Sequence, residues 1–233
     1  MSWINVFKIN NNLKKPLNSL IVDSTYTPIR VVTASTTYVP ERNGLYRVIC
    51  VGAGGASVAK SSSNTAYGSG GGGGGVAVKD IYLDSSTSYN ITVSTTASFS
   101  NLLTATAGAQ AGYRTGSGVT MTAEPTGGTG SGGDKNYTGE KGSYGTTTYT
   151  TSMSVSYSGG SIGCVIADLT RQHISNDSRG NNLSYGRSLL KYGGGAPAAL
   201  SNYVNSEGSE VARFFPRPGL PAAVLIIPIE MED

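Results

Sequence analysis

The chain has 233 residues, of which 38% are hydrophobic, so it can bury a sizeable core as one large domain, with or without a short attachment segment. Only 13% of the residues are charged, about half the usual share of roughly 25%, and the formal net charge is +3. This balance gives no case for nucleic acid or a membrane surface as a partner, and no segment approaches the roughly 18 apolar residues of a membrane span.

Segment 1–33 differs from the rest because it contains no glycine and holds the only tryptophan. Its apolar residues alternate with polar ones around Trp3, Phe7 and Ile9, and again from Ile29 to Val32, so both runs predict strands. Two interpretations stay open. The segment is an ordinary pair of N-terminal strands, or it attaches the chain to a larger assembly with Trp3, Phe7 and Ile9 as apolar anchors.

The first residues, Met1 to Asn12, hold no apolar stretch long enough for a signal peptide, so we expect synthesis in a cytoplasm. The two cysteines, Cys50 and Cys164, lie far apart and each sits in an apolar run. Small apolar thiols are common in protein cores, which favours two buried free cysteines. Their spacing does not argue for a disulfide but leaves one possible.

From Ala34 onward, short patterned runs alternate with turn residues, which predicts a glycine-rich β domain over 34–233. The dipeptide Asn43-Gly44 before an apolar run is a strong turn signal. No stretch shows a convincing helical stripe, and Ile166 to Ile174 fits at most one short helical turn. The strands predicted here are Leu45 to Val51, Val76 to Leu83, Tyr89 to Val93, Phe99 to Thr106 and Ala222 to Ile229.

Six consecutive glycines, Gly70 to Gly75, are followed by further glycine clusters for more than a hundred residues. Such a run makes a poor helix and a poor strand, because glycine loses the most backbone entropy on folding. A flexible linker is one alternative, but linkers do not recur in this way inside a domain. Extended helices of the polyproline II type pack side by side only where side chains are missing. We therefore predict an all-β fold that combines strands with packed polyglycine-II-type segments.

Sequence patterns for catalysis or cofactor binding fail on context. Gly52-Ala53-Gly54 follows a predicted strand, but Ser57 stands where a dinucleotide fingerprint needs glycine or alanine, and no helix follows. The single histidine, His173, excludes sites with several histidines, and no serine lies in a G-x-S-x-G elbow. The polar loop 176–182 lacks an EF-hand pattern. We expect no enzyme, catalytic residue, cofactor or metal, and keep a polysaccharide depolymerase as a third-ranked function.

Six motifs resemble the glycine-rich domain of phage and prophage tail-fibre proteins: Tyr38-Val39-Pro40, Tyr46 to Gly55, Gly70 to Leu83, Tyr89 to Val93, Ser98-Phe99-Ser100, and the ending Pro218 to Ile227. The recurring glycine motifs are also similar to those of the T-even phage tail-fibre adhesins. That resemblance implies a sandwich of polyglycine helices whose intervening loops bind host receptors. It also implies a location in the virion tail, with other tail-fibre or baseplate proteins as partners, and a homotrimer or a cap on a trimeric fibre.

The resemblance makes a receptor-binding adhesin the first functional hypothesis, with a bacterial surface polysaccharide or outer protein as partner. A structural tail or baseplate component without receptor contact is the alternative. Tyrosine rings stack on sugars or apolar loops, and arginine meets acidic groups, so aromatic and basic residues between glycine clusters are the candidates. Tyrosines that only cover glycine backbone within the fold are the competing interpretation. The candidate binding residues are Tyr149, Tyr157, Arg171, His173 and Arg179.

Overall fold

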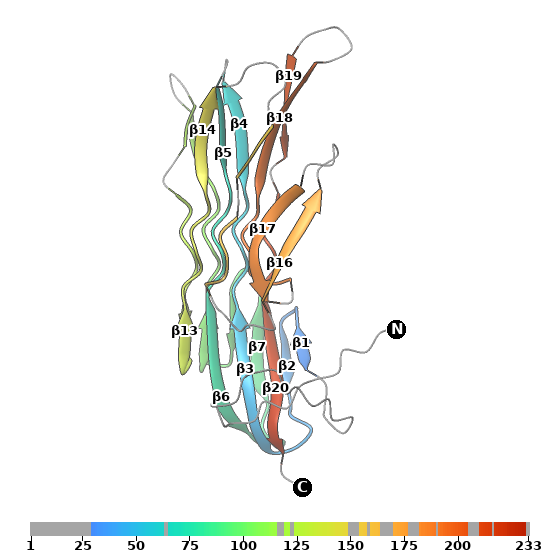
Figure 1. Ribbon diagram of the computed structural model, residues 1–233. Helices are drawn as coiled ribbons and strands as arrows, with labels where there is room; N and C mark the ends of the chain where they lie inside the picture. Colours follow the sequence, from blue (N-terminus) through green and yellow to red (C-terminus); the bar gives the residue numbers. More distant parts are fainter. Residues whose placement is uncertain are drawn as a thin grey trace, which may run out of the picture.

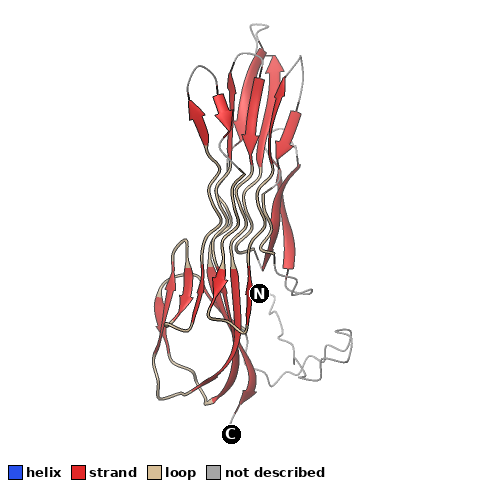
Figure 2. Cartoon of the chain, turned by 90° about the vertical axis from the view of Figure 1, so that its left-hand side faces the viewer, coloured by secondary structure: helices blue, strands red, loops and turns tan. Residues whose placement is uncertain are grey.

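The computed structural model describes residues 29–62, 65–115, 119–121, 124–148, 154–157, 159–163, 170–176, 182–189, 191–204, 210–215 and 217–231. Within these ranges the chain forms twenty strands and no helix, so the all-β prediction is confirmed. A helix long and apolar enough to cross a membrane is correspondingly absent from this part of the chain. The strands lie at the two ends of an elongated molecule, and glycine-rich segments without strand pairing run side by side between them (Figures 1 and 2).

One end of the molecule is a sandwich of two five-stranded antiparallel sheets. The first sheet contains the longest apolar strands of the chain. Its central strands were predicted correctly from their apolar runs, with bounds that differ by one or two residues. In spatial order the first sheet is β1 (Arg30–Val32), β20 (Ala223–Met231), β3 (Gly44–Val51), β6 (Val76–Leu83) and β13 (Lys135–Tyr137).

The second sheet of the sandwich contains short strands, and one prediction in it was wrong. The stretch Phe99 to Thr106 is not one strand but a hairpin that turns at Ser100, whose φ of 47° is left-handed. A straight strand would send Phe99 and Leu103 along one line, whereas the hairpin pairs them directly and buries both in the same core. In spatial order this sheet is β12 (Gly130–Ser131), β9 (Leu103–Ala105), β8 (Ala97–Phe99), β7 (Tyr89–Val93) and β2 (Thr36–Tyr38).

The first sheet is buried on both faces, which explains why β3 and β20 read as nearly continuous apolar runs. Val48, Val224 and Phe99 belong to the cluster between the two sheets. Ile49 and Leu225 lie in a second cluster on the opposite face. Successive residues along a strand therefore belong alternately to the two clusters, because side chains of a strand point to opposite faces in turn.

Cys50 lies in the cluster between the sheets and is a buried free cysteine, as expected. Burial raises the pKa of its thiol to about 12, against an ordinary value of 9.0, because the thiolate cannot be solvated there. This thiol is therefore a core side chain rather than a nucleophile. Cys164 lies outside the described residues.

The other end of the molecule consists of smaller antiparallel sheets and hairpins (Figure 1). The short helical turn expected within Ile166 to Ile174 is wrong for its described part, because Thr170–Asn176 pairs as strand β16 with β17. The elements of this end are β14 (Tyr144–Thr148), β5 (Thr65–Ser69) and β4 (Val58–Ser62) in one sheet; β15 (Ser154–Tyr157), β18 (Ala198–Val204) and β19 (Glu210–Phe215) in a second; and the hairpin β10 (Tyr113–Thr115) with β11 (Val119–Met121). The hairpin β16 (Thr170–Asn176) with β17 (Asn182–Leu189) lies beside the glycine-rich segments (Figure 1).

The described chain enters and leaves through the same end. Its first strand, β1, pairs with its last strand, β20, and both belong to the sandwich. The sheets built from β4, β5, β14, β15, β18 and β19 stand at the opposite end, beyond the glycine-rich segments (Figure 1). The fold therefore separates a sandwich end, which contains the first and last described strands, from an upper end of smaller sheets and a hairpin.

Candidate functional site

The glycine-rich segments between the two ends pack around a central run, 70–75, which is the six-glycine stretch of the sequence. Every residue of this run is buried. We use the name glycine layer for the central run together with the segments that surround it. The surrounding segments are 52–57, 106–112, 124–129, 138–143, 159–163 and 193–197.

The amides of the central run donate hydrogen bonds to three neighbouring segments in strict rotation. Gly70 and Gly73 donate to carbonyls of segment 138–143, at 2.8 and 2.9 Å. Gly71 and Gly74 donate to segment 193–197, and Gly72 and Gly75 donate to segment 106–112. Every third residue thus points at the same neighbour, so one turn of this extended backbone contains three residues.

The carbonyls of the central run face the three remaining segments. The Gly71 carbonyl accepts from Gly160 at 2.9 Å, and the Gly73 carbonyl accepts from Gly128 at 2.8 Å. The carbonyls of Gly72 and Gly75 both accept from segment 52–57. Donors and acceptors together bind the run to six segments, which meets the requirement that buried backbone groups be paired.

The six neighbours also bond to one another, so they form a closed ring around the central run. Each neighbouring pair in the ring shares at least one backbone hydrogen bond. The bonds that close the ring are Gly108 to Ala53, Ala109 to Thr126, Gly139 to Gly128, Glu140 to Ser161, Gly195 to Gly160 and Ala196 to Gly55. Two further segments, 217–222 and the part of β17 around Gly186, bond to the outside of this ring.

The ring leaves no space for side chains at residues 71–75 of the central run. A Cβ atom at Gly72 would overlap the carbonyl of Thr126, and one at Gly73 would overlap the carbonyl of Ser161. Gly71, Gly74 and Gly75 meet backbone atoms in the same way. None of the residues 70–75 has a positive φ, so glycine is needed here for close approach and not for an unusual backbone conformation.

The glycine layer connects directly to the strands of the upper end. Segments 52–57, 106–112, 138–143 and 193–197 lead into β4, β10, β14 and β18, while β5, β11 and β15 return into the layer. Strand β19 is followed by 217–222, which bonds to the outside of the ring. The upper strands therefore stand on a platform held by backbone hydrogen bonds (Figure 2). Recognition surfaces are commonly loops or strands positioned on such a rigid scaffold, which makes the upper end the candidate functional site.

The predicted binding residues fall in separate sheets. Tyr157 is the last residue of β15, paired with Ala198, and the layer resumes two residues later at Gly159. Its backbone therefore lies at the layer end of its strand. Tyr149 lies outside the described residues.

Arg171 and His173 belong to the hairpin β16–β17 at the side of the glycine layer (Figure 1). Arg171 pairs with Ser188, and His173 sits where the register shifts between Gln172 and Ile174. The shift places Tyr185 and Gly186 opposite the single residue His173, so β17 carries a bulge. At this bulge, the amide of Gly186 donates a hydrogen bond to the carbonyl of Gly195 in the layer. Arg179 lies outside the described residues.

The predicted anchors Trp3, Phe7 and Ile9 also lie outside the described residues. The end of the same segment is described, and it belongs to the sandwich: Val32 is 7% exposed and packs in the core between the sheets. Within the predicted attachment segment, the described strand Arg30–Val32 is thus part of the sandwich.

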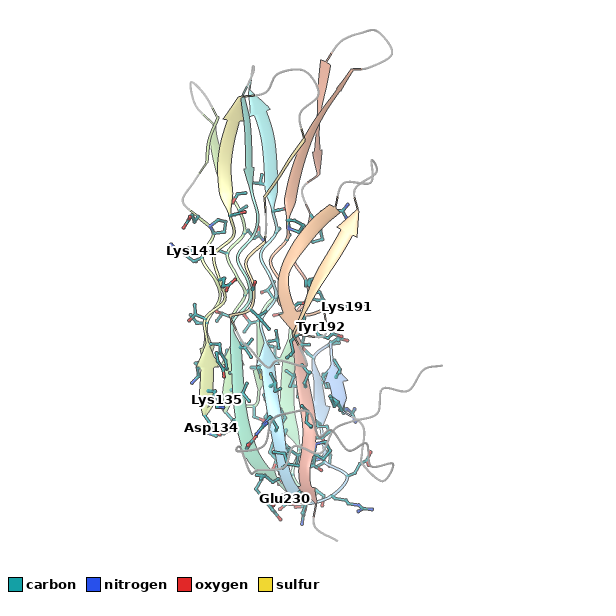
Figure 3. All side chains as sticks on the ribbon, in the orientation of Figure 1. Asp134, Lys135, Lys141, Lys191, Tyr192 and Glu230 are labelled. Atoms are coloured by element: carbon teal, nitrogen blue, oxygen red, sulfur yellow. The ribbon has the colours of Figure 1, made fainter. Side chains whose placement is uncertain are left out.

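The charged residues whose side chains are described make few close pairs. Arg47 and Asp80 face each other on β3 and β6 with two hydrogen bonds of 2.7 Å, and these bonds raise the pKa of Arg47 above its usual value. Lys141 pairs with Glu124 at 3.1 Å across two segments of the layer, on its surface (Figure 3). Within the described ranges no three His, Cys, Asp or Glu residues gather into a group that could hold a metal ion.

Sequence reasoning missed the sheet β14–β5–β4, because none of the predicted strands lies within 56–69 or 144–148. A signal was present: strand β5 leads without interruption into the six-glycine run. Because β5 continues directly into the hydrogen-bonded run 70–75, the backbone of that run fixes the end of the strand. Neither a scan of family models nor a search of curated proteins finds a match to this chain, so its function is argued from the geometry described above.

Proposed function

We propose that this chain is a non-enzymatic tail-tip protein of a phage or phage-like particle that binds a receptor on the bacterial surface. One observation supports this most directly. The glycine layer holds the upper strands at the end of the molecule opposite to the sandwich, through which the chain enters and leaves. A protein anchored at one end and presenting hairpins at the other suits attachment to a host.

The proposal includes the nature of the glycine layer, which we infer to be a sandwich of polyglycine-II helices. Its support is the three-residue rotation of hydrogen bonds from 70–75, because an extended helix with three residues per turn and no internal bonds directs its amides in this way. Six neighbours around one helix are the densest side-by-side packing of rods, and only glycine lets every contact close.

The proposed partners are other tail-fibre or baseplate proteins at the sandwich end and a bacterial polysaccharide or outer protein at the upper end. One chain completes the ring around its own central run. This favours a single copy that caps a trimeric fibre over a homotrimer, in which chains would share their glycine layers. The mass of the isolated chain in solution distinguishes the two arrangements.

Adsorption measurements test the receptor-binding function. The intact chain, fluorescently labelled, is incubated with a panel of bacterial strains, and a strain that binds it is challenged with particles carrying the same chain. We expect excess free chain to reduce adsorption of the particles, with heat-unfolded chain as the control. Absence of binding to every strain whose cells adsorb the particles would favour the structural alternative.

A second test addresses the residues predicted from the sequence. Alanine at both Tyr149 and Tyr157 should reduce adsorption while the melting temperature stays nearly unchanged, since a recognition tyrosine contributes contact area to the ligand rather than to the fold. Normal adsorption by a stable double variant would remove these tyrosines from the site. A large loss of stability would show that they cover the glycine backbone.

A further inference from the structure

The second sheet of the sandwich carries no charged side chain. Its strands β2, β7, β8, β9 and β12 contain no Asp, Glu, Lys, Arg or His, and the whole stretch 85–113 lacks them as well. Charged residues stand in the flanking turns, where Asp84 precedes β7 and Asp134 follows β12. A sheet face that only has to stay soluble usually holds charged side chains, which also prevent association. Solubility alone therefore does not explain this sheet.

Hydroxyl side chains occupy its outer face in cross-strand rows. The middle row contains Thr92, Ser98, Thr104 and Ser131, which pair with one another in this order across β7, β8, β9 and β12. The residues that flank the row along the strands, such as Phe99, lie in the cluster between the sheets. Since side chains alternate along a strand, the row itself lies on the opposite, outer face.

This outer face is open to solvent. Thr92 and Ser131, at the two ends of the row, are exposed, and Ser98 and Thr104 are half-buried between their neighbours on adjacent strands. On their inner side, the strands of this sheet contact β3, β6 and β20 of the first sheet. A ligand can therefore reach the hydroxyls without displacing a described part of the chain.

The four hydroxyls of the middle row make no hydrogen bond within the described chain. The rows on either side differ from it. Toward the glycine layer, the Thr106 hydroxyl accepts from the amide of Thr129 at 2.8 Å. Away from the layer, the side chains of Thr37 and Asn90 contact each other, with 3.5 Å between Oγ1 and Oδ1. The middle row thus keeps its donors and acceptors for a ligand.

The chemistry and spacing of the row suit a chain of neutral sugars. Adjacent strands lie about 4.7–4.9 Å apart, close to the length of one pyranose unit in an extended polysaccharide. A hydroxyl both donates and accepts, so it pairs with sugar hydroxyls in either direction. Threonine methyl groups offer apolar contact to sugar C–H groups. An acidic polymer would lose hydration here without meeting a counterion.

We propose that the middle row binds a neutral polysaccharide that lies across β7, β8, β9 and β12, with one sugar unit at each strand. The four free hydroxyls form the hydrogen bonds to the sugars. The row belongs to the sandwich, at the end of the molecule opposite to the upper sheets (Figure 1). This site is therefore separate from the receptor contacts proposed for the upper end, and it does not rest on them.

Affinity electrophoresis of the intact chain tests the inference. Native gels contain a soluble linear glucan, mannan or galactan, with polygalacturonate as the acidic comparison. We expect at least one neutral polymer to retard the chain and polygalacturonate to leave its mobility unchanged. Oligosaccharides of the retarding polymer should bind more tightly with each added unit up to about four, because the row spans four strands.

Replacing threonine by valine removes a hydroxyl and keeps the branched shape that suits a strand. The Thr92→Val, Thr104→Val double variant should bind about tenfold more weakly, because two hydrogen bonds are lost. Thr87→Val is the matched control, since Thr87 is exposed in the turn between β6 and β7, away from the row. Its affinity should change by less than about twofold.

Melting temperatures show whether each variant is folded. If the double variant is not, Ser98→Arg replaces it, because a long charged side chain in the middle of the row should abolish binding. Retardation by none of the neutral polymers, equal retardation by polygalacturonate, or equal loss of affinity in Thr87→Val overturns the inference. Adsorption of the wild-type chain to cells, measured separately, reports on the proposed function.

Discussion

At the scale of single residues, the central glycines are determined by what surrounds them. The run 70–75 has an ordinary backbone, yet a methyl group on Gly73 would overlap the carbonyl of Ser161. A neighbouring side chain can often rotate away from an added methyl group. A neighbouring backbone carbonyl cannot, because moving its segment would break the hydrogen bonds of that segment. A glycine in this layer is therefore less replaceable than a glycine in a turn.

Substitution of Gly73 by Ala tests this directly. We expect loss of the cooperative unfolding transition, because displacing one segment breaks bonds in the whole ring, and the net stability of a domain is only about 5–15 kcal/mol. Ala109→Ser, at an exposed position of segment 106–112, is the control and should change stability by less than about 0.5 kcal/mol. Circular dichroism during heating measures both. An unchanged melting curve for Gly73→Ala would contradict the packed layer.

Cys50 gives a second residue-scale prediction, on the pH dependence of stability. Burial raises the pKa of its thiol to about 12, so the folded state retains a proton that the unfolded state releases near 9. The stabilisation is complete below about pH 9 and is lost as pH rises toward 12. The Tyr38 hydroxyl, whose pKa burial also raises to about 12, acts in the same direction.

The measurement is the free energy of unfolding in urea between pH 7 and 11. We expect a decline in the alkaline range that is shallower in Cys50→Val, which keeps the volume and removes the titrating group. Reaction with a thiol reagent at pH 8 should be slow for Cys50 in the folded chain and fast after unfolding. A wild-type slope equal to that of the valine variant would show that Cys50 does not contribute.

At the scale of elements, the first sheet of the sandwich is the best-buried part of the described chain. β3 and β20 pair along most of their length, and each contributes to both apolar clusters. Alternation alone would have predicted one solvated face. The second face is covered by residues from distant parts of the chain, among them Ile162 and Leu189. Strands with two buried faces hold a sheet together most strongly.

Leu225 on β20 tests the contribution of this sheet. Its side chain is fully buried, so Leu225→Ala should cost about 2–5 kcal/mol of unfolding free energy through lost burial and the remaining cavity. Leu102, which is 41% exposed in the turn between β8 and β9, provides the comparison, and Leu102→Ala should cost much less. Chemical denaturation of both variants gives the values. Similar losses would mean that the second apolar cluster adds little stability.

At the scale of the whole molecule, the fold places the sandwich and the upper sheets at opposite ends. The sandwich contains the first and last described strands, and the upper sheets lie beyond the glycine layer (Figure 1). Between the two ends, backbone hydrogen bonds join the central run to six neighbouring segments and join those segments to one another. The tail-tip proposal depends on this arrangement rather than on any single residue.

Removal of residues 1–28 tests the attachment role of the N-terminal segment. The truncation leaves β1 and its pairing with β20 intact, so we expect the remaining chain to fold and to compete for binding to cells. Its incorporation into particles should fall strongly, because the predicted anchors Trp3, Phe7 and Ile9 are absent. Mass spectrometry of purified particles measures incorporation. Full incorporation of the truncated chain would refute the anchors.

The sequence by itself determined the longer strands of the sandwich, β3, β6, β7 and β20, and the need for glycine at 71–75. Alternating apolar residues and a run that suits neither helix nor ordinary strand are local properties, and a local pattern suffices to recognise them. The hairpin that turns at Ser100 was not predicted, because its apolar residues fit a single straight strand equally well. Strand β16 was not predicted, because the sequence there has a weak helical pattern and its pairing with β17 involves a separate strand.

Only the tertiary structure decided which segments surround the central run. Gly71 bonds to Ala196 and Gly160, partners distant in the chain, and all of these contacts are made by backbone atoms, which are the same in every residue. Sequence patterns depend on side chains. A glycine run without side chains therefore does not indicate which segments will lie next to it. For the same reason the position of the Tyr157 backbone beside the layer followed only from the order of the segments in space.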